Sequence, residues 1–296
     1  MTRRDFMALL AAGTILTLAP AAQAKKDKDE EKGNKGGKDN GKGGTGGEIA
    51  ITNNGTIGVF WDDQNGSNDG VRGIYALSKG GDGRDTDDNS DSGGDGEAGY
   101  QVQVTVNNDI TVTSENHVDG LSGGVVAISE GGDGGEAPGS NHGGDGARGS
   151  DRDGGDRGTS LVEINNDATV TTQGQDISGI VLRSKGGDGG DGQDGDRDSS
   201  GGDGGDGGEV EVTVNDSATV ATGGPSAYGV LVQSIGGAGG DGGDNTALVG
   251  ESGGGGYGGD AGRLAFASAS DTEISTAGDY AAGVTLQSIG GGGGAG

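Results

Sequence analysis

The nine-residue stretch GVLVQSIGG, Gly229–Gly237, decides the fold of this chain because four related copies of it occur elsewhere in the sequence. Each copy begins with Gly and Ile or Val, has a further apolar residue at the fourth position and Ser at the sixth, and ends in Gly-Gly. The intervals between the copies are about 50 to 55 residues, a regular spacing that is typical of repeat proteins. The serines of the five copies are Ser78, Ser129, Ser184, Ser234 and Ser288.

The fourth repeat shows what each unit contains ahead of this closing phrase. Its residues 210–214, 218–222 and 230–234 are rich in Val and Thr and alternate in side-chain character, which predicts β-strands. Asn and Asp residues between the first two segments, at 107–109, 165–167 and 215–216 in successive repeats, predict tight turns. Each repeat is therefore expected to form one rung of three short strands.

A single rung cannot fold alone. Burying its few small apolar side chains contributes on the order of 10 kcal/mol, whereas ordering its residues costs at least about 25 kcal/mol. The rungs must therefore stack, and we expect a mainly β protein, a parallel β-solenoid with repeats at about 48–98, 99–158, 159–207, 208–261 and 262–296. In this stack the five serines should align as an internal ladder of hydroxyl groups beside the Gly-Gly corner.

The Gly/Asp-rich tracts that separate the rungs carry most of the acidic residues. The chain has 75 Gly but only three Pro and no strict Gly-x-y period, so it is not collagen. With almost no apolar positions to bury, the tracts are predicted to be mobile insertions that project from one edge of the solenoid. They lie at about 82–98, 133–158, 188–207 and 238–261. The net charge of −28 argues against a nucleic-acid partner.

The first 24 residues have the features of an export signal. Arg3 and Arg4 supply a positive start, an apolar run covers 8–19, and Ala22 and Ala24 are small residues suited to cleavage. The paired arginines also resemble a twin-arginine signal, so the general secretory route and the twin-arginine route both stay open. The apolar run is too short to span a membrane, and we expect no transmembrane span in the mature chain. Residues 25–47 are predicted to be a disordered Lys/Asp/Gly leader.

Calcium is the one metal that the acidic tracts suggest, because it prefers carboxylate oxygens. Neither the twelve-residue helix-flanked loop nor the tandem nonapeptide of calcium β-rolls is matched. Weak calcium binding and a solvated acidic spacer are therefore the two interpretations of the tracts, and no other cofactor is expected. The candidate calcium ligands are Asp85, Asp87, Asp188, Asp191 and Asp194.

Enzymatic signatures are weak. Ser122 and Ser252 lie in Gly-x-Ser-x-Gly matches, but matches of this kind arise by chance in so glycine-rich a chain. His117 and His142 are the two histidines, and both lie in polar contexts. We expect no catalytic residue and no enzymatic activity.

The closing phrases GVLVQSIGGAGGDGG from Gly229 and GVTLQSIGGGGGAG from Gly283 resemble repeats in the passenger regions of bacterial autotransporters of the type V secretion class. The resemblance covers about 48–296 and lies in scaffold positions. It implies a right-handed β-helix at the surface of a Gram-negative bacterium, often with an adhesive or virulence function. A C-terminal membrane barrel, which such proteins carry, is not present in the printed sequence.

The sequence therefore predicts an exported, non-enzymatic β-solenoid at the cell surface, in the outer membrane or outside the cell, with the periplasm as a further location. Its expected role is adhesion or spacing, and its expected partners are the export machinery and an unidentified surface or host ligand. One alternative is a calcium-responsive secreted binding module. A less favoured alternative, based on fold analogy alone, is an enzyme acting on polysaccharide.

Overall fold

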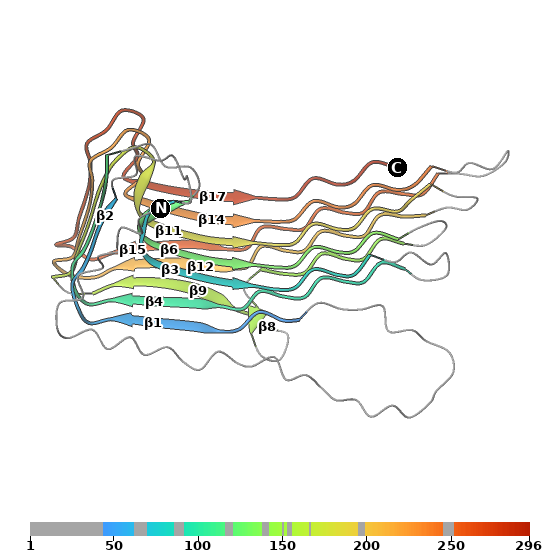
Figure 1. Cartoon of the computed structure of the whole chain (residues 1–296), viewed down its shortest axis with the longest axis horizontal. Helices are drawn as coiled ribbons and strands as arrows, with labels where there is room; N and C mark the ends of the chain where they lie inside the picture. Colours follow the sequence, from blue (N-terminus) through green and yellow to red (C-terminus); the bar gives the residue numbers. More distant parts are fainter. Residues whose placement is uncertain are drawn as a thin grey trace, which may run out of the picture.

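The computed structural model describes residues 44–61, 70–85, 92–115, 121–137, 142–149, 151–152, 156–165, 167–194, 199–244 and 252–296. Over these ranges the chain forms 17 strands and no helix. Fifteen of the strands make three parallel five-stranded sheets, and each repeat contributes one strand to each sheet. The predicted parallel β-solenoid is therefore confirmed at the level of its architecture (Figure 1).

The three sheets, here named A, B and C, follow the order of the strands within a rung. Sheet A contains β1 (Ile49–Asn53), β4 (Val102–Val106), β9 (Thr159–Ile164), β12 (Glu209–Val214) and β15 (Leu264–Ser268). Sheet B contains β2 (Ile57–Trp61), β5 (Ile110–Ser114), β10 (Thr169–Gln173), β13 (Thr219–Thr222) and β16 (Glu273–Thr276). Sheet C contains β3 (Arg72–Lys79), β6 (Ser122–Glu130), β11 (Ile177–Lys185), β14 (Val230–Ile235) and β17 (Val284–Ile289). A short antiparallel pair, β7 (Asp151–Arg152) and β8 (Asp156–Arg157), lies outside the three sheets.

Register between rungs keeps equivalent residues side by side. Val162 of β9 pairs with Val104 of β4 on one side and with Val212 of β12 on the other. All three valines are at most 1% exposed, because the inward side chains of successive rungs cover one another. The stacked columns of small aliphatic residues form one continuous core that runs through all five rungs.

Sheet C also carries a second apolar cluster on its other face, made by Val126, Ile128, Val181 and Leu231. At the first rung this face is open, since Tyr75 and Leu77 are 45% and 38% exposed, whereas Val181 in the third rung is 1% exposed. The middle rungs of sheet C therefore bury apolar side chains on both faces.

The turns between strands use the Asn and Asp residues that the sequence singled out. Asp167, between sheets A and B, has a φ of 61°, in the left-handed region that Asp and Asn tolerate better than most residues. Asn107, Asn165 and Asn215 stack at the same turn. The side-chain amide of Asn165 donates to Asn107 at 2.8 Å, and that of Asn215 donates to Asn165 at 2.7 Å.

No helix within the described part of the chain is long and apolar enough to span a membrane. The predicted signal, with Arg3, Arg4, Ala22 and Ala24, lies outside the described residues, as does the leader up to residue 43. Residues 44–47, which the sequence assigned to the disordered leader, are instead hydrogen-bonded: Gly81 donates to the carbonyl of Gly44, and Gly46 donates to that of Ala98.

Candidate functional site: a slab of glycine-rich legs

The sequence predicts mobile insertions for the Gly/Asp tracts, but their described residues are joined by backbone hydrogen bonds and are not isolated loops. Each tract leaves sheet C as an extended outgoing leg and comes back to sheet A as an extended returning leg, and the legs of successive repeats stack in parallel (Figure 1). We call this stack the slab. Its outgoing legs are 80–85, 131–137, 186–194, 236–244 and 290–296, and its returning legs are 44–47, 92–99, 142–149, 199–208 and 252–262.

The triplet Gly-Gly-Asp explains how the slab is held together. In the outgoing leg of the third repeat, the N–H of Gly189 donates to the carbonyl oxygen of Ala238 in the next outgoing leg at 2.8 Å. The N–H of Gly190 donates across to Gly144 of a returning leg, also at 2.8 Å. The N–H of Asp188 donates to the Oδ1 atom of Asp133 in the previous repeat at 2.8 Å. Each of the three backbone donors in a triplet thus has its own partner, which is what a packed backbone requires.

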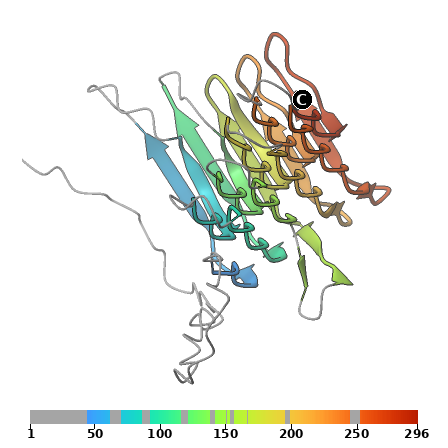
Figure 2. The same cartoon turned by 90° about the vertical axis from the view of Figure 1, so that its right-hand side faces the viewer.

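The outgoing legs form one layer and the returning legs form the other, and hydrogen bonds between the two layers make continuous series through the repeats. In one series the N–H of each member donates to the carbonyl oxygen of the preceding member at 2.8–2.9 Å; in order, its members are Gly94, Gly135, Gly144, Gly190, Gly202, Gly240, Gly256 and Gly294. A second series lies three residues away along each leg, through Glu97, Gly132, Ala147, Gly187, Gly205, Gly237, Gly259 and Gly291. A three-residue period without bonds inside the strand is typical of polyproline II geometry, and each leg viewed end-on is a tight coil (Figure 2).

Glycine is required in the legs for close approach and not for backbone conformation. Among the described glycines only Gly70 and Gly174 have a positive φ, and neither belongs to a leg. A Cβ atom added to Gly189 would lie 2.1 Å from the carbonyl oxygen of Gly202, and one added to Gly134 would lie 1.8 Å from that of Gly144. Any larger residue at these positions would force the two layers apart.

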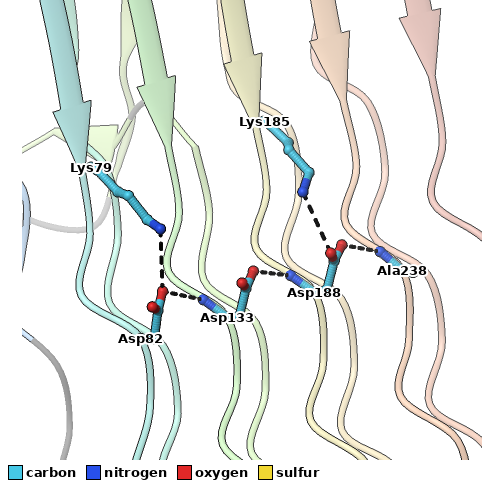
Figure 3. A network of polar contacts seen from close by, with 6 residues as sticks. All are labelled: Lys79, Asp82, Asp133, Lys185, Asp188 and Ala238. Atoms are coloured by element: carbon cyan, nitrogen blue, oxygen red, sulfur yellow. Dashed lines mark hydrogen bonds and ion pairs between the residues drawn. The ribbon is translucent and has the colours of Figure 1, made fainter. Parts of the chain in front are cut away.

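Aspartates form columns along an exposed face of the slab, and one of these columns is drawn in Figure 3. Asp82 accepts from the N–H of Asp133, Asp133 from Asp188, and Asp188 from Ala238, at 3.2, 2.8 and 2.9 Å. Lys185 lies 3.4 Å from Asp188, and Lys79 lies 3.7 Å from Asp82. Side chains of both ion pairs are about one-third to one-half exposed, so these pairs contribute little stability.

The repeat serines close each rung at the junction between the solenoid and the slab. They pair in register along sheet C, and Ser129, Ser184 and Ser234 are fully buried. The hydroxyl of Ser234 donates to the carbonyl of Gly208 at 2.9 Å and accepts from the N–H of Gly262 at 2.7 Å. The hydroxyls of Ser78, Ser184 and Ser234 therefore bond to the backbone of the returning legs, in addition to the alignment that the sequence predicts. We call the five repeat serines the latch serines.

Four of the five candidate calcium ligands lie in the slab, and Asp87 lies outside the described residues. Asp85, Asp188, Asp191 and Asp194 each accept, through Oδ1, one backbone N–H of the following repeat at 2.8–3.0 Å. Within the described ranges no group of three or more His, Cys, Asp or Glu residues is placed to hold a metal ion. Their observed contacts are those of scaffold residues.

The residues of the weak enzymatic motifs do not come together. Ser122 is 2% exposed, and its hydroxyl accepts from the N–H of Val71 at 3.0 Å. Ser252 and His142 lie in returning legs, and the carbonyl of His142 accepts from Gly93 at 2.9 Å. His117 is outside the described residues. The printed contacts of Ser122 and His142 are backbone scaffold bonds.

Sequence reasoning missed the slab, although its signal was present. The Gly-Gly-Asp triplet recurs with a period of three, which matches the three residues per turn of a polyproline II helix. Comparison of the chain with protein-family models, with curated proteins and with solved structures finds no match in any of the three.

Proposed function

We propose that this protein is an exported, non-enzymatic scaffold in which a β-solenoid body carries a stiff acidic slab, and that it acts at the cell surface in adhesion or as a spacer. The observation that supports this function most directly is the use of polar groups in the slab. Backbone N–H groups and Asp carboxylates form hydrogen bonds between repeats, as the N–H of Ala238 does with Asp188. A slab bonded in this way is suited to hold a bound molecule at a distance from the solenoid body.

We place the binding function in the stretches of sequence between each outgoing leg and the returning leg that follows it. The legs follow one triplet pattern, whereas these connecting segments, at 86–91, 138–141, 195–198 and 245–251, differ in sequence. Variable connections on a regular scaffold commonly carry recognition. The ligand would be a surface or host molecule that contacts these segments.

Export and surface location rest on the N-terminal signal and on the resemblance to autotransporter passengers. We propose that the solenoid is right-handed, as this resemblance implies, and that the protein lies at the outer surface or outside the cell.

Cell fractionation and protease treatment of intact producing cells test the location. We expect the full repeat region to be cleaved by external protease while a cytoplasmic marker protein survives. Recovery of the protein only from the cytoplasm would refute the proposal. Replacing Arg3 and Arg4 by Lys then separates the two export routes, because a twin-arginine signal depends on the arginine pair.

Adhesion is tested by exchanging the four connecting segments for Gly-Ser linkers of the same length. We expect the exchanged protein to keep its circular dichroism spectrum and to lose binding to the host or surface on which the native chain is retained. Unchanged retention would exclude the connecting segments as the binding site.

Calcium binding is the second candidate function, because the aspartate columns place carboxylates of successive repeats next to one another. Calorimetric titration with calcium at millimolar concentration tests it. If calcium is bound, we expect heat release together with a higher unfolding temperature. The absence of both effects would exclude a calcium-responsive module.

A further inference from the structure

An aspartate followed by glycine is the kind of backbone linkage most prone to spontaneous isomerisation, because glycine has no Cβ atom to hinder the approach of its own nitrogen. The glycine nitrogen attacks Cγ of the aspartate, a carbon–oxygen bond of the carboxyl group breaks, and the oxygen leaves as water with the amide proton and one further proton. The succinimide ring that forms takes up water and opens largely to isoaspartate. The main chain then runs through Cβ and Cγ and is one carbon atom longer.

The triplet sequence makes the slab vulnerable to this reaction. An extra main-chain carbon would move every later residue of a leg out of its three-residue register with the neighbouring legs, and the slab bonds depend on that register. The described legs contain nine Asp-Gly pairs, which begin at Asp82, Asp95, Asp133, Asp145, Asp188, Asp191, Asp203, Asp206 and Asp241.

Both reacting groups of each pair are held by a single residue of the next repeat. Oδ1 of Asp188 accepts from the N–H of Ala238 at 2.9 Å, as Figure 3 shows, and the N–H of Gly189 donates to the carbonyl oxygen of the same Ala238 at 2.8 Å. We call these two bonds the Asp-Gly clamp. All nine pairs have it, and the residues that hold them are, in order, Asp133, Asp145, Asp188, Asp203, Ala238, Asp241, Tyr257, Asp260 and Ala295.

The clamp keeps the glycine nitrogen and the aspartate Cγ atom from reacting with each other. Attack requires the peptide group between them to rotate, which breaks the glycine bond, and requires the carboxyl group to turn away from the neighbouring leg. The close packing of the two layers leaves little room for this rotation: a Cβ atom added to Gly204 would lie 2.2 Å from the carbonyl oxygen of Gly237. Reaction therefore has to wait until the leg opens locally.

We propose that the nine pairs are latent isomerisation sites, which react only when the legs separate and which the Asp-Gly clamp otherwise protects. The reaction needs no enzyme or cofactor, and water is its only co-reactant. In this arrangement the aspartates of the slab protect the backbone that they belong to, because their carboxylates form one of the two bonds of each clamp. The protection does not depend on the adhesive or spacing function proposed above.

Prolonged incubation of the purified chain at neutral pH tests the protection, with proteolysis and mass spectrometry that separates aspartyl from isoaspartyl peptides. The same chain unfolded in guanidinium chloride and a synthetic peptide of the sequence 186–192 are the references. We expect isoaspartate to form at least about tenfold more slowly in the folded legs, because the reaction needs an open leg. Equal rates in the folded chain and in the two references would overturn the proposal.

The variant Ala238→Pro tests the clamp at one pair. Proline fits the extended polyproline II leg, and it removes the N–H that Asp188 accepts while keeping the carbonyl oxygen that accepts from the following glycine. We expect isoaspartate at Asp188 to rise by about threefold or more relative to Asp191 in the same leg, whose bond from Asp241 is unchanged.

The control for this comparison is Gly254→Ala, because a Cβ atom there meets nothing within 4 Å. It should keep the native ratio of isoaspartate at Asp188 to that at Asp191. Circular dichroism checks that each variant keeps the β structure of the native chain. A native ratio in Ala238→Pro would show that the carboxylate bond gives no protection and would overturn the clamp.

Discussion

At the scale of single residues, the latch serines show why one side chain recurs in every repeat. The hydroxyl of Ser78 donates to the carbonyl of Gly47 at 2.8 Å and accepts from the N–H of Tyr100 at 3.0 Å. A hydroxyl is the smallest side-chain group that both donates and accepts, and it fits beside the tight Gly-Gly corner. Ala would leave backbone groups unpaired, and Thr or Asn would add volume in a buried space.

Substitution Ser184→Ala tests the latch. Its hydroxyl accepts from the N–H of Gly208 at 2.9 Å in a fully buried position, so removal should lower the free energy of unfolding by about 1–3 kcal/mol. Ser288→Ala, in the exposed last rung, is the control and should change stability by less than about 0.5 kcal/mol. Urea unfolding followed by circular dichroism measures both. Equal effects at the two positions would contradict the latch.

At the scale of the elements, the legs are regular structure built without side-chain burial. Strands such as β9 are held by an apolar face, and Val162 and Ile164 are fully buried. A leg such as 186–194 has no apolar face and is held by backbone bonds to four neighbouring legs, an approach that glycine permits at positions such as Gly189. The cost of ordering glycine is high, so the legs depend on every one of these bonds.

Replacing a glycine inside the slab should therefore be costly. In Gly189→Ala the new Cβ atom would lie 2.1 Å from the carbonyl oxygen of Gly202, and we expect a loss of about 1–3 kcal/mol together with faster amide exchange in the slab. Gly254→Ala is the matched control, because a Cβ atom there meets nothing within 4 Å. Hydrogen exchange measured by mass spectrometry compares the slab amides of the two variants. Slow exchange retained in the slab of Gly189→Ala would contradict close packing of the legs.

At the scale of the whole molecule, the net charge of −28 is arranged in part as columns of like charge. Neighbouring strands in a sheet are about 4.8 Å apart, so carboxylates of successive repeats lie well within the screening length of about 10 Å at 0.1 M salt. Their hydrogen bonds to backbone N–H groups favour the stack, while their mutual repulsion opposes it. The balance between these two effects depends on ionic strength.

We therefore expect the unfolding temperature to rise when sodium chloride increases from about 0.05 M to about 0.5 M, as screening weakens the repulsion. The double variant Asp133→Asn, Asp188→Asn keeps an oxygen that can accept each backbone N–H but removes two charges from one column. Its unfolding temperature should depend less on salt than that of the native chain. Differential scanning calorimetry measures both proteins, and an equal or opposite salt dependence would contradict the role of the columns.

The amino-acid sequence by itself determined the rung. Alternating Val and Thr, Asn-rich turns and the recurring phrase ending at Gly237 specify three strands and their stacking, because side-chain periodicity reports which face is buried. Only the tertiary structure decided the slab and the bonds of the latch serines. A glycine such as Gly190 has no side chain to signal a partner, and its N–H finds Gly144, 46 residues away in sequence, only after the rungs have brought the legs together. Backbone bonds between legs leave no mark on hydrophobic periodicity, so a tract that reads as an unstructured acidic loop becomes an ordered layer.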